Sequence, residues 1–275
     1  MTIPRALFPM YSPFNTQMND NCDNKHNDQE ELSIFYINIQ SLVSKNLLLI
    51  KELQDYLPVN IICVAEHWCS DTVSMKLDGY KLITSFVRSE KSRGGVGIFI
   101  EEDATATVID VKNLCIESNF EACAIKCLAT NQKVLNSPVV VAAVYRTPES
   151  NFDIFLSKLD EMLLKLSIHK CDLFLTGDFN VWMHDNDCKE NIRLRSMIGS
   201  LNMELMLNNV YTRIRKTSST LLDNCITNNV DAATIFIDPS LSDHAGFKIK
   251  ANLPNSFRKE PKMTRVFNRL KLIKF

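Results

Sequence analysis

Two short stretches of this chain carry side chains whose types and spacing suit chemistry. The first is an apolar run, residues 173–176, followed by Gly177, Asp178 and, two positions on, Asn180. If the run is a buried strand, Asp178 and Asn180 emerge at its carboxyl end, where open α/β sheets hold their ligands. Residues two apart in extended chain point to the same face, so this carboxylate and this amide can converge on one bound group.

The second stretch places a carboxylate directly beside an imidazole, at Asp243 and His244. Together with the first stretch it offers metal ligation by carboxylates, hydrogen-bond donation by an amide and proton transfer by a histidine. These capabilities, gathered in one place, suit the hydrolysis of a phosphate ester.

The segments that must position these residues show a mixture of strand and helix patterns. Strands are expected at 32–38, 60–65, 93–100 (after a Gly-rich turn), 106–111, 122–128, 138–145, 173–176, 234–237 and 247–249, with two short ones within 211–226. Helices are expected at 45–57, where Pro58 stops the apolar stripe, and at 152–166 and 192–201. This mixture predicts an α/β fold of packed sheets faced by helices.

Polar side chains also stand at the ends of other predicted strands. Asn38, Glu66 and Tyr145 each end an apolar run or begin the loop that follows it. Separate strands that deliver acids, amides and a histidine to one edge of a sheet build a loop-borne active site. Each residue alone also fits an ordinary role, such as a cap, a solvated acid, a rim aromatic, an Asx turn or a structural histidine. The complete set favours an active site.

Composition limits the classes of protein to which the chain can belong. The 275 residues are 45% hydrophobic and 23% charged, which suffices for a large domain, expected at 32–253. Residues 1–31 are expected to be an irregular or disordered leader, and 254–275 a basic tail or the start of a linker.

The sequence predicts neither a membrane span nor a secretory signal, because no apolar run approaches about 18 residues and the amino terminus has no continuous apolar segment. The nine cysteines include no CxxC pair and indicate free thiols in a reducing compartment. We therefore expect an intracellular protein, nuclear or cytoplasmic, with no membrane partner. The formal net charge of −1 gives no general argument for a nucleic-acid partner.

The order of these residues resembles the endonuclease/exonuclease/phosphatase superfamily, which includes DNase I and apurinic endonucleases. More narrowly, the chain is similar to the endonuclease domain of non-LTR retrotransposons. The resemblance covers about residues 32–253 and rests on seven motifs in the family's order: Asn38-Ile39-Gln40-Ser41, Ala65-Glu66-His67-Trp68, Arg93-Gly94-Gly95-Val96-Gly97, Val144-Tyr145-Arg146-Thr147-Pro148, Gly177-Asp178-Phe179-Asn180, Thr220-Leu221-Leu222-Asp223 and Ser242-Asp243-His244. It implies a four-layer, DNase I-like sandwich of two mixed β-sheets with helices outside.

The resemblance implies a metal site. Glu66 is the counterpart of the family's Mg²⁺ ligand, with Asn38 and Asp243 close to the metal, and Mn²⁺ is the alternative ion. Oxygen ligands of this kind suit Mg²⁺, which dehydrates reluctantly and keeps several waters. Gln40 stands where apurinic-repair relatives carry an acid that assists the metal, and retroelement relatives commonly lack that acid.

The resemblance also implies catalytic roles. Asp178 would orient or deprotonate the attacking water, while Asn180 and Tyr145 would hydrogen-bond the scissile phosphate. His244, paired with Asp223, would stabilise the charged phosphorane. Asp223 fits this supporting place because it ends the short apolar run before it; its alternative interpretation is a turn acid. A carboxylate behind a histidine keeps the imidazole charged and oriented.

Double-stranded DNA is the partner that the resemblance implies. Arg93 lies near the Gly-rich turn, as do Arg88 and Lys91, and a short hairpin is expected at 211–220. The hairpin carries three further candidates for DNA contact, which are Arg213, Arg215 and Lys216. Phosphate contacts position a protein on DNA. Ordinary surface solvation is the alternative for each of these cations.

These observations predict a magnesium-dependent endonuclease that nicks one DNA strand and leaves a 3′-hydroxyl. In a full-length element that end would prime reverse transcription by a polymerase domain, which is expected there and absent from this chain. The alternatives are another phosphoesterase of the same fold, an apurinic repair enzyme, or a decayed module that binds nucleic acid or protein without catalysis.

Overall fold

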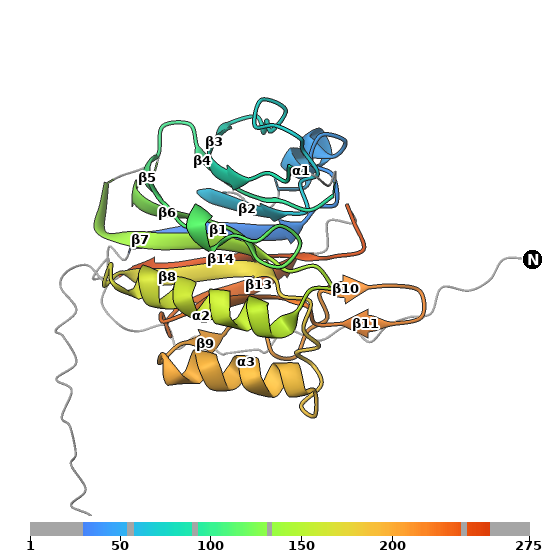
Figure 1. Cartoon of the computed structure of the whole chain (residues 1–275). Helices are drawn as coiled ribbons and strands as arrows, with labels where there is room; N and C mark the ends of the chain where they lie inside the picture. The colour runs from blue at the N-terminus through green and yellow to red at the C-terminus, as the bar shows by residue number, and fades with distance from the viewer. Residues whose placement is uncertain (1–29, 54–57, 90–92, 131–133, 238–240, 254–275) are drawn as a thin grey trace, which may run out of the picture.

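The structure is a computed structural model that describes residues 30–53, 58–89, 93–130, 134–237 and 241–253. Most of the predicted leader, the whole basic tail and Lys91 lie outside the described residues. Two six-stranded mixed sheets form the centre of the molecule (Figure 1).

The first sheet joins segments from both halves of the chain. Its strands, in spatial order, are β13 (Ala233–Ile237), β14 (Gly246–Leu253), β1 (Glu30–Asn38), β2 (Ile61–Ala65), β4 (Val96–Glu101) and β3 (Tyr80–Phe86). β1 and β2 are parallel, and Asn38 pairs with Ala65 at their carboxyl ends. β14 runs antiparallel to β1, so it begins at this same edge.

The second sheet contains the strand that leads to Asp178. Its strands, in spatial order, are β5 (Thr105–Ile109), β6 (Glu121–Ala129), β7 (Val134–Tyr145), β8 (Asp172–Asp178), β12 (Asp223–Thr227) and β9 (Glu204–Leu205). β7 and β8 are parallel, and Tyr145 pairs with Asp178 at their carboxyl ends. Each sheet therefore carries the ends of a parallel pair, and these ends bear the predicted site residues.

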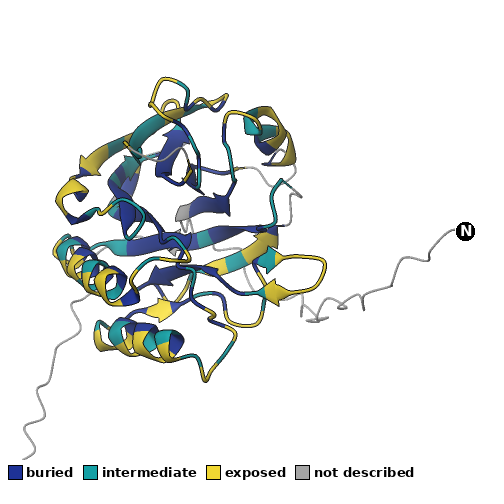
Figure 2. Ribbon diagram, turned by 45° about the vertical axis from the view of Figure 1, so that its right-hand side comes forward, coloured by how far each residue is buried: buried dark blue, intermediate teal, exposed yellow. Residues whose placement is uncertain are grey.

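Helices cover both outer faces of the two sheets. α1 (Asn46–Leu53) packs its buried leucines on the first sheet, while α2 (Phe152–Ser167) packs on the second, beside α3 (Lys189–Ser200). A short 3₁₀ helix, η2 (Lys112–Leu114), precedes β6. Buried strands lie between helices whose outer faces are exposed (Figure 2). This arrangement confirms the predicted four-layer sandwich.

A two-stranded hairpin projects from the sandwich at the edge that carries the site residues. It consists of β10 (Arg213–Ile214) and β11 (Ser219–Thr220), paired antiparallel, and it lies where a hairpin was expected (Figure 1). Its backbone bonds the segment before β14, because Ile214 N–H donates to Asp243 O at 2.8 Å.

The sequence patterns did not predict β3 or β9. β3 is an edge strand whose residues are mostly half-buried, and β9 has two residues, so neither has a clear apolar period. The cysteines among the described residues are free thiols, as predicted. In the parts of the chain that the structure describes, no helix has the length and apolar character to cross a bilayer.

Candidate active site

A chain of hydrogen bonds connects the polar ends of both sheets. Asn38 Nδ2 donates to Glu66 Oε1 and to Asp178 Oδ2, at 2.9 Å each. Asn38 ends β1 and Asp178 ends β8, so this one amide bridges the first sheet to the second. The structure therefore brings these three predicted residues together.

A buried carboxylate–histidine network lies next to Asp178. His244 Nδ1 donates to Asp223 Oδ2 at 2.8 Å and lies 4.0 Å from Asp178 Oδ2. The Tyr36 hydroxyl donates to the second oxygen of Asp223 at 3.0 Å. The side chains of Asp178, Asp223 and His244 are each at most 2% exposed.

Asp223 follows the short apolar run Leu221–Leu222, as the sequence shows, but the sequence patterns did not show that a strand begins at Asp223. Asp223 is the first residue of β12, which runs antiparallel to β8 and places Asp223 opposite Asp178. Because antiparallel strands begin where their neighbours end, the start of β12 reaches the same edge. His244 arrives similarly, shortly before β14.

The environment keeps His244 charged. Burial alone lowers the pKa of His244, but the charge and hydrogen bond of Asp223 outweigh it and, with the other nearby carboxylates, raise that pKa to about 10. Burial, followed by the charge of Asp223, raises the pKa of Asp178 well above its usual range. Asp178 is therefore a stronger base than a solvated carboxylate, beside a histidine that is protonated at neutral pH.

The raised pKa of His244 makes the free energy of unfolding depend on pH. The folded pKa of His244 is about 10, and the unfolded value is about 6.5. The stabilisation is therefore complete below pH 6.5 and is lost as pH rises through 10. Between pH 7 and 8.5 we expect the contribution of His244 to the free energy of unfolding to fall by about 2 kcal/mol.

Urea unfolding at several pH values, in EDTA, measures this dependence. His244→Gln should lack the part of the slope that one proton contributes. If His244→Gln unfolds with the wild-type slope, the imidazole is not charged in the folded protein.

Asn38 and Glu66 fit a hard divalent cation. Asn38 Oδ1 is a buried side-chain oxygen that has no hydrogen-bond partner among the described residues. A buried oxygen without a partner costs free energy unless a donor or a cation satisfies it. This oxygen belongs to the amide that bonds Glu66, so an amide oxygen and a carboxylate, both ligands of the oxygen type that Mg²⁺ binds, lie on neighbouring side chains.

Asp178, Asp223 and His244 also place one potential ligand atom each within 4.8 Å of one another. A histidine must be neutral to ligate a metal. His244 instead is protonated at neutral pH and donates from Nδ1 to Asp223. His244 Nδ1 is already bonded to Asp223 Oδ2, so we interpret this trio as a charged hydrogen-bonded network.

Asp243 lies at the edge of the cluster, and both of its oxygens have protein partners. Oδ1 accepts from Gln40 Nε2 at 2.7 Å and lies 3.7 Å from His244 Nε2. Oδ2 accepts from Arg213 Nε at 3.0 Å and from Arg215 Nε at 2.8 Å. Burial opposes the shift, but the hydrogen bond from Arg215 and the nearby positive charges lower the pKa of Asp243.

The two predicted phosphate-binding residues join the same cluster. The Tyr145 hydroxyl interacts with Glu66, and burial, then the charges of Glu66 and Asp178, raises the pKa of Tyr145. The phenol therefore remains a neutral donor. Asn180 N–H donates to Asp178 Oδ1 at 3.0 Å, with φ of +47° at Asn180.

The Gly-rich turn before β4 positions Glu66. Glu66 has φ of +53°, which is uncommon for a residue with a side chain. Its N–H donates to Gly95 O at 2.8 Å. Gly95 itself has φ of +85°, and a Cβ there would lie 2.2 Å from His67 Nε2. Only glycine fits this close approach, so the turn fixes the backbone that presents Glu66.

The interpretation of Arg88 as a DNA contact is wrong. Its side chain is 6% exposed, and Nη2 lies 2.6 Å from Glu121 Oε1. Glu121, which opens β6, also accepts from Gly95 N–H at 2.7 Å. A buried carboxylate needs such partners, so Arg88 supports the Gly-rich turn from inside the protein.

The other cations predicted to contact DNA surround the same edge. Arg93 lies 5.2 Å above the ring of Trp68, whose Nε1 donates to Glu66 at 2.9 Å. Lys216 is exposed between β10 and β11. A pocket of about 630 Å³ adjoins the hairpin; its lining includes Asn180, Trp182, His184, Arg213, Arg215 and Thr220.

Sequence reasoning missed four side chains that support the site. Gln40, Trp68 and Arg146 belong to the motifs quoted from the sequence, but the sequence did not show their contacts. Gln40 bonds Asp243, Trp68 bonds Glu66 and Arg146 bonds Asn180. The fourth, Tyr36, lies two positions before Asn38 on the same strand. Because residues two apart share a face, this spacing was a signal that the phenol points to the same edge.

Comparison with known proteins agrees with this geometry. A family described as "Endonuclease-reverse transcriptase" matches residues 139–248. That segment contains Tyr145, Asp178, Asn180, Asp223 and His244. No curated protein matches the chain.

Solved structures share the fold at low sequence identity. The endonuclease domain of TRAS1, a telomere-specific non-LTR retrotransposon, matches with a TM-score of 0.64 and 14% identity over 82% of this chain and 99% of that one. The apurinic endonuclease LMAP of Leishmania major matches with a TM-score of 0.60 and 14% identity, over 82% and 88% of the two chains. The human Nocturnin catalytic domain matches with 0.56 and 16%, over 81% and 96%.

These findings confirm the fold and the resemblance predicted from the sequence. The described residues have the same fold as these solved structures. The segment that the family model matches runs from within β7 to within β14, so it includes β8, β9, β12 and β13 and leaves out β5 and β6 of the second sheet.

Proposed function

We propose that this protein, whose residues 139–248 match the endonuclease-reverse transcriptase family, is a divalent-metal-dependent endonuclease that nicks one strand of DNA. The observation that carries the proposal is the continuous contact network from Glu66 through Asn38, Asp178 and His244 to Asp223. It joins residues suited to metal binding, to a general base and to a charged donor within one cluster.

Glu66 and Asn38 would hold the metal, with Asp243 beside them. When bound, Mg²⁺ would neutralise charge on the phosphate oxygens and on the leaving oxygen. Mn²⁺ has similar ligand preferences and is the second ion to test.

Asp178 would accept a proton from the attacking water. Its raised pKa favours this role, and hydrogen bonds from Asn38 and Asn180 hold its two oxygens in place. The water oxygen bonds to phosphorus, the bond from phosphorus to the 3′ oxygen breaks, and that oxygen takes a proton from solvent. The products are a 3′-hydroxyl and a 5′-phosphate.

His244 would stabilise the negative charge that develops on the phosphate. The Nδ1 bond to Asp223 orients the ring, and Nε2, which lies 3.7 Å from Asp243 Oδ1, would donate to a phosphate oxygen. The Tyr145 hydroxyl and the Asn180 amide supply neutral donors. Arg93, Arg213, Arg215 and Lys216 would meet the DNA backbone around this centre. In a longer chain the 3′-hydroxyl would prime reverse transcription by an adjoining polymerase domain.

Plasmid nicking tests the proposal. We expect the purified protein to convert supercoiled plasmid to open circles with Mg²⁺ or Mn²⁺ and to stop in EDTA. A DNA polymerase should extend the nicks without prior removal of a 3′-phosphate. A folded protein that cuts nothing with either ion, or that leaves 3′-phosphates, would contradict it; cleavage confined to abasic sites would indicate a repair enzyme.

A further inference from the structure

Arg146 is a buried cation that directly follows Tyr145, the last residue of β7. Its side chain is 3% exposed, and its guanidinium lies 5.1 Å and 5.6 Å from the ring centroids of Phe152 and Phe155. A charge in such surroundings is strongly destabilising unless its donors are satisfied. The partners of Arg146 therefore indicate what it does.

Arg146 bonds three consecutive residues, the last residue of β8 and the first two of the loop that follows it. The backbone N–H of Arg146 donates to the backbone oxygen of Asp178 at 3.0 Å. Its Nη1 lies within hydrogen-bond distance of Phe179 O, at 3.4 Å, and Asn180 O, at 3.2 Å. Its own carbonyl accepts from Asn180 Nδ2 at 2.6 Å. Both the main chain and the side chain of Asn180 are thus held by Arg146.

The guanidinium is fixed from its other side by helix α3. Nη1 and Nη2 lie 3.0 Å and 3.4 Å from the two oxygens of Glu190, in a forked pair. Glu190 lies in the first turn of α3. The Arg146–Glu190 pair therefore fastens the loop between β8 and α3 at both of its ends.

We propose that Arg146 is the positioning residue of this active site and that it acts through Asn180, an inference that rests on the proposed function. Asn180 has φ of +47°, a left-handed conformation that side chains seldom adopt. The hydrogen bonds to Arg146 hold it there and take one Nδ2 hydrogen. The amide keeps its second hydrogen for a phosphate oxygen.

Arg146→Lys tests this role because lysine keeps the charge but lacks the planar fork. We expect kcat for nicking, per folded molecule, to fall about 10-fold or more, with KM within about 3-fold, since a small misplacement of a reacting group is costly. Glu190→Gln should also lower kcat. Because the Glu190 side chain is half-exposed, this variant replaces Arg146→Lys in the test if Arg146→Lys does not fold.

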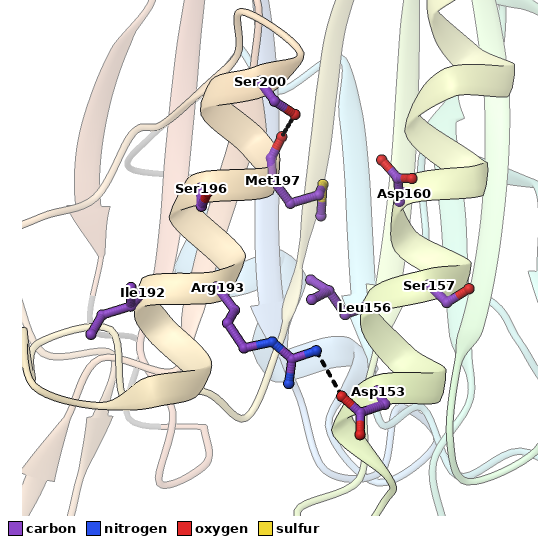
Figure 3. A pocket seen from close by; sticks show the side chains of 9 residues that line it. All are labelled: Asp153, Leu156, Ser157, Asp160, Ile192, Arg193, Ser196, Met197 and Ser200. Carbon is purple, nitrogen blue, oxygen red and sulfur yellow. Dashed lines mark hydrogen bonds and ion pairs between the residues drawn. The ribbon is translucent and has the colours of Figure 1, made fainter.

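Arg193→Lys is the matched control. Arg193 also lies over the Phe152 ring, at 5.1 Å, and pairs with Asp153 at 2.7 Å across the groove between α3 and α2 (Figure 3). It shares the aromatic contact but bonds no residue of the loop from Asp178 to Asn180 in the described structure. Its kcat and KM should remain those of the wild type.

A double-mutant cycle separates positioning from general stability. In an Asn180→Ala background, Arg146→Lys should lower kcat no further than about 2-fold, because residues that act as one unit are non-additive. Full additivity of the two losses would overturn the inference.

The side-chain amide signal of Asn180 in ¹⁵N spectra gives a readout that needs no activity. Arg146→Lys should shift or broaden it, while the Asn224 amide, which donates to Leu207 O at 2.7 Å, should stay unchanged. An unchanged Asn180 signal would overturn the inference even if the wild type nicks DNA. A wild type that never nicks would instead contradict the proposed function and leave this readout valid.

Discussion

Replacing Asp178 by Asn is expected to lower the rate constant of DNA nicking by about 10³-fold, as the loss of a general base usually does. The change keeps the shape of the side chain and removes its ability to accept a proton. Asp178 Oδ2 accepts from Asn38 and Oδ1 from the Asn180 N–H. Because Asn offers only one acceptor oxygen, one of these two donors loses its partner.

Asp178→Asn should have nearly the same free energy of unfolding as the wild type. The raised pKa of Asp178, caused by burial and by the charge of Asp223, shows that folding opposes its ionisation. Relief of that charge offsets the lost hydrogen bond, which is worth about 1 kcal/mol. We expect urea unfolding at pH 8 to give a free energy no more than about 1 kcal/mol below that of the wild type.

Asp172→Asn is the control for this experiment. Asp172 begins the same strand at the opposite edge and accepts from Asn229 Nδ2 at 2.8 Å. It should nick at the wild-type rate. Wild-type activity in Asp178→Asn would show that this carboxylate takes no proton in the reaction, and equal losses in both variants would trace the effect to the strand as a whole.

The part of the site that the sequence predicts well is set by the ends of strands. Asn38, Glu66, Tyr145 and Asp178 follow apolar runs that are visible in any window of the chain. Two parallel pairs, β1 with β2 and β7 with β8, bring these ends to one edge. A local pattern and one rule of sheet geometry therefore predict their convergence within each sheet. The packing of the two sheets, which no local pattern shows, brings Asn38 and Asp178 into contact.

Asp223 marks where that reasoning stops. Its own pattern shows a polar residue beside an apolar pair, and the strand after it was not recognised as beginning there. Its place opposite Asp178 depends on the antiparallel direction of β12, which is a property of the pairing between two distant segments. The residues next to Asp223 in the sequence carry no information about this pairing.

Charge partners are the second limit. Exposure in a predicted hairpin makes Arg213 and Arg215 candidates for DNA contact, but both bond Asp243 from about 30 residues away in the chain. Arg88 similarly bonds Glu121 inside the protein. Which cation meets which carboxylate is decided by the folded arrangement, because each local sequence only shows that a charge is present.

The contrast between Glu66 and Asp243 leads to the second large effect. The two oxygens of Glu66 accept from neutral donors, Asn38 Nδ2 and Trp68 Nε1. Asp243 has two arginines on one oxygen and Gln40 on the other. Positive side chains oppose a nearby cation, so Glu66 is the carboxylate better able to bind Mg²⁺ in this arrangement.

Glu66→Gln is therefore expected to raise the Mg²⁺ concentration for half-maximal nicking at least about 10-fold, the low end of what altered metal surroundings cost. It should also reduce the rise in melting temperature that Mg²⁺ produces in the absence of DNA, because only a ligand that binds the folded state stabilises it. Asp243→Asn should weaken this thermal shift less. If Asp243→Asn abolishes the shift while Glu66→Gln retains it, Asp243 is the principal ligand and the assignment of Glu66 is wrong.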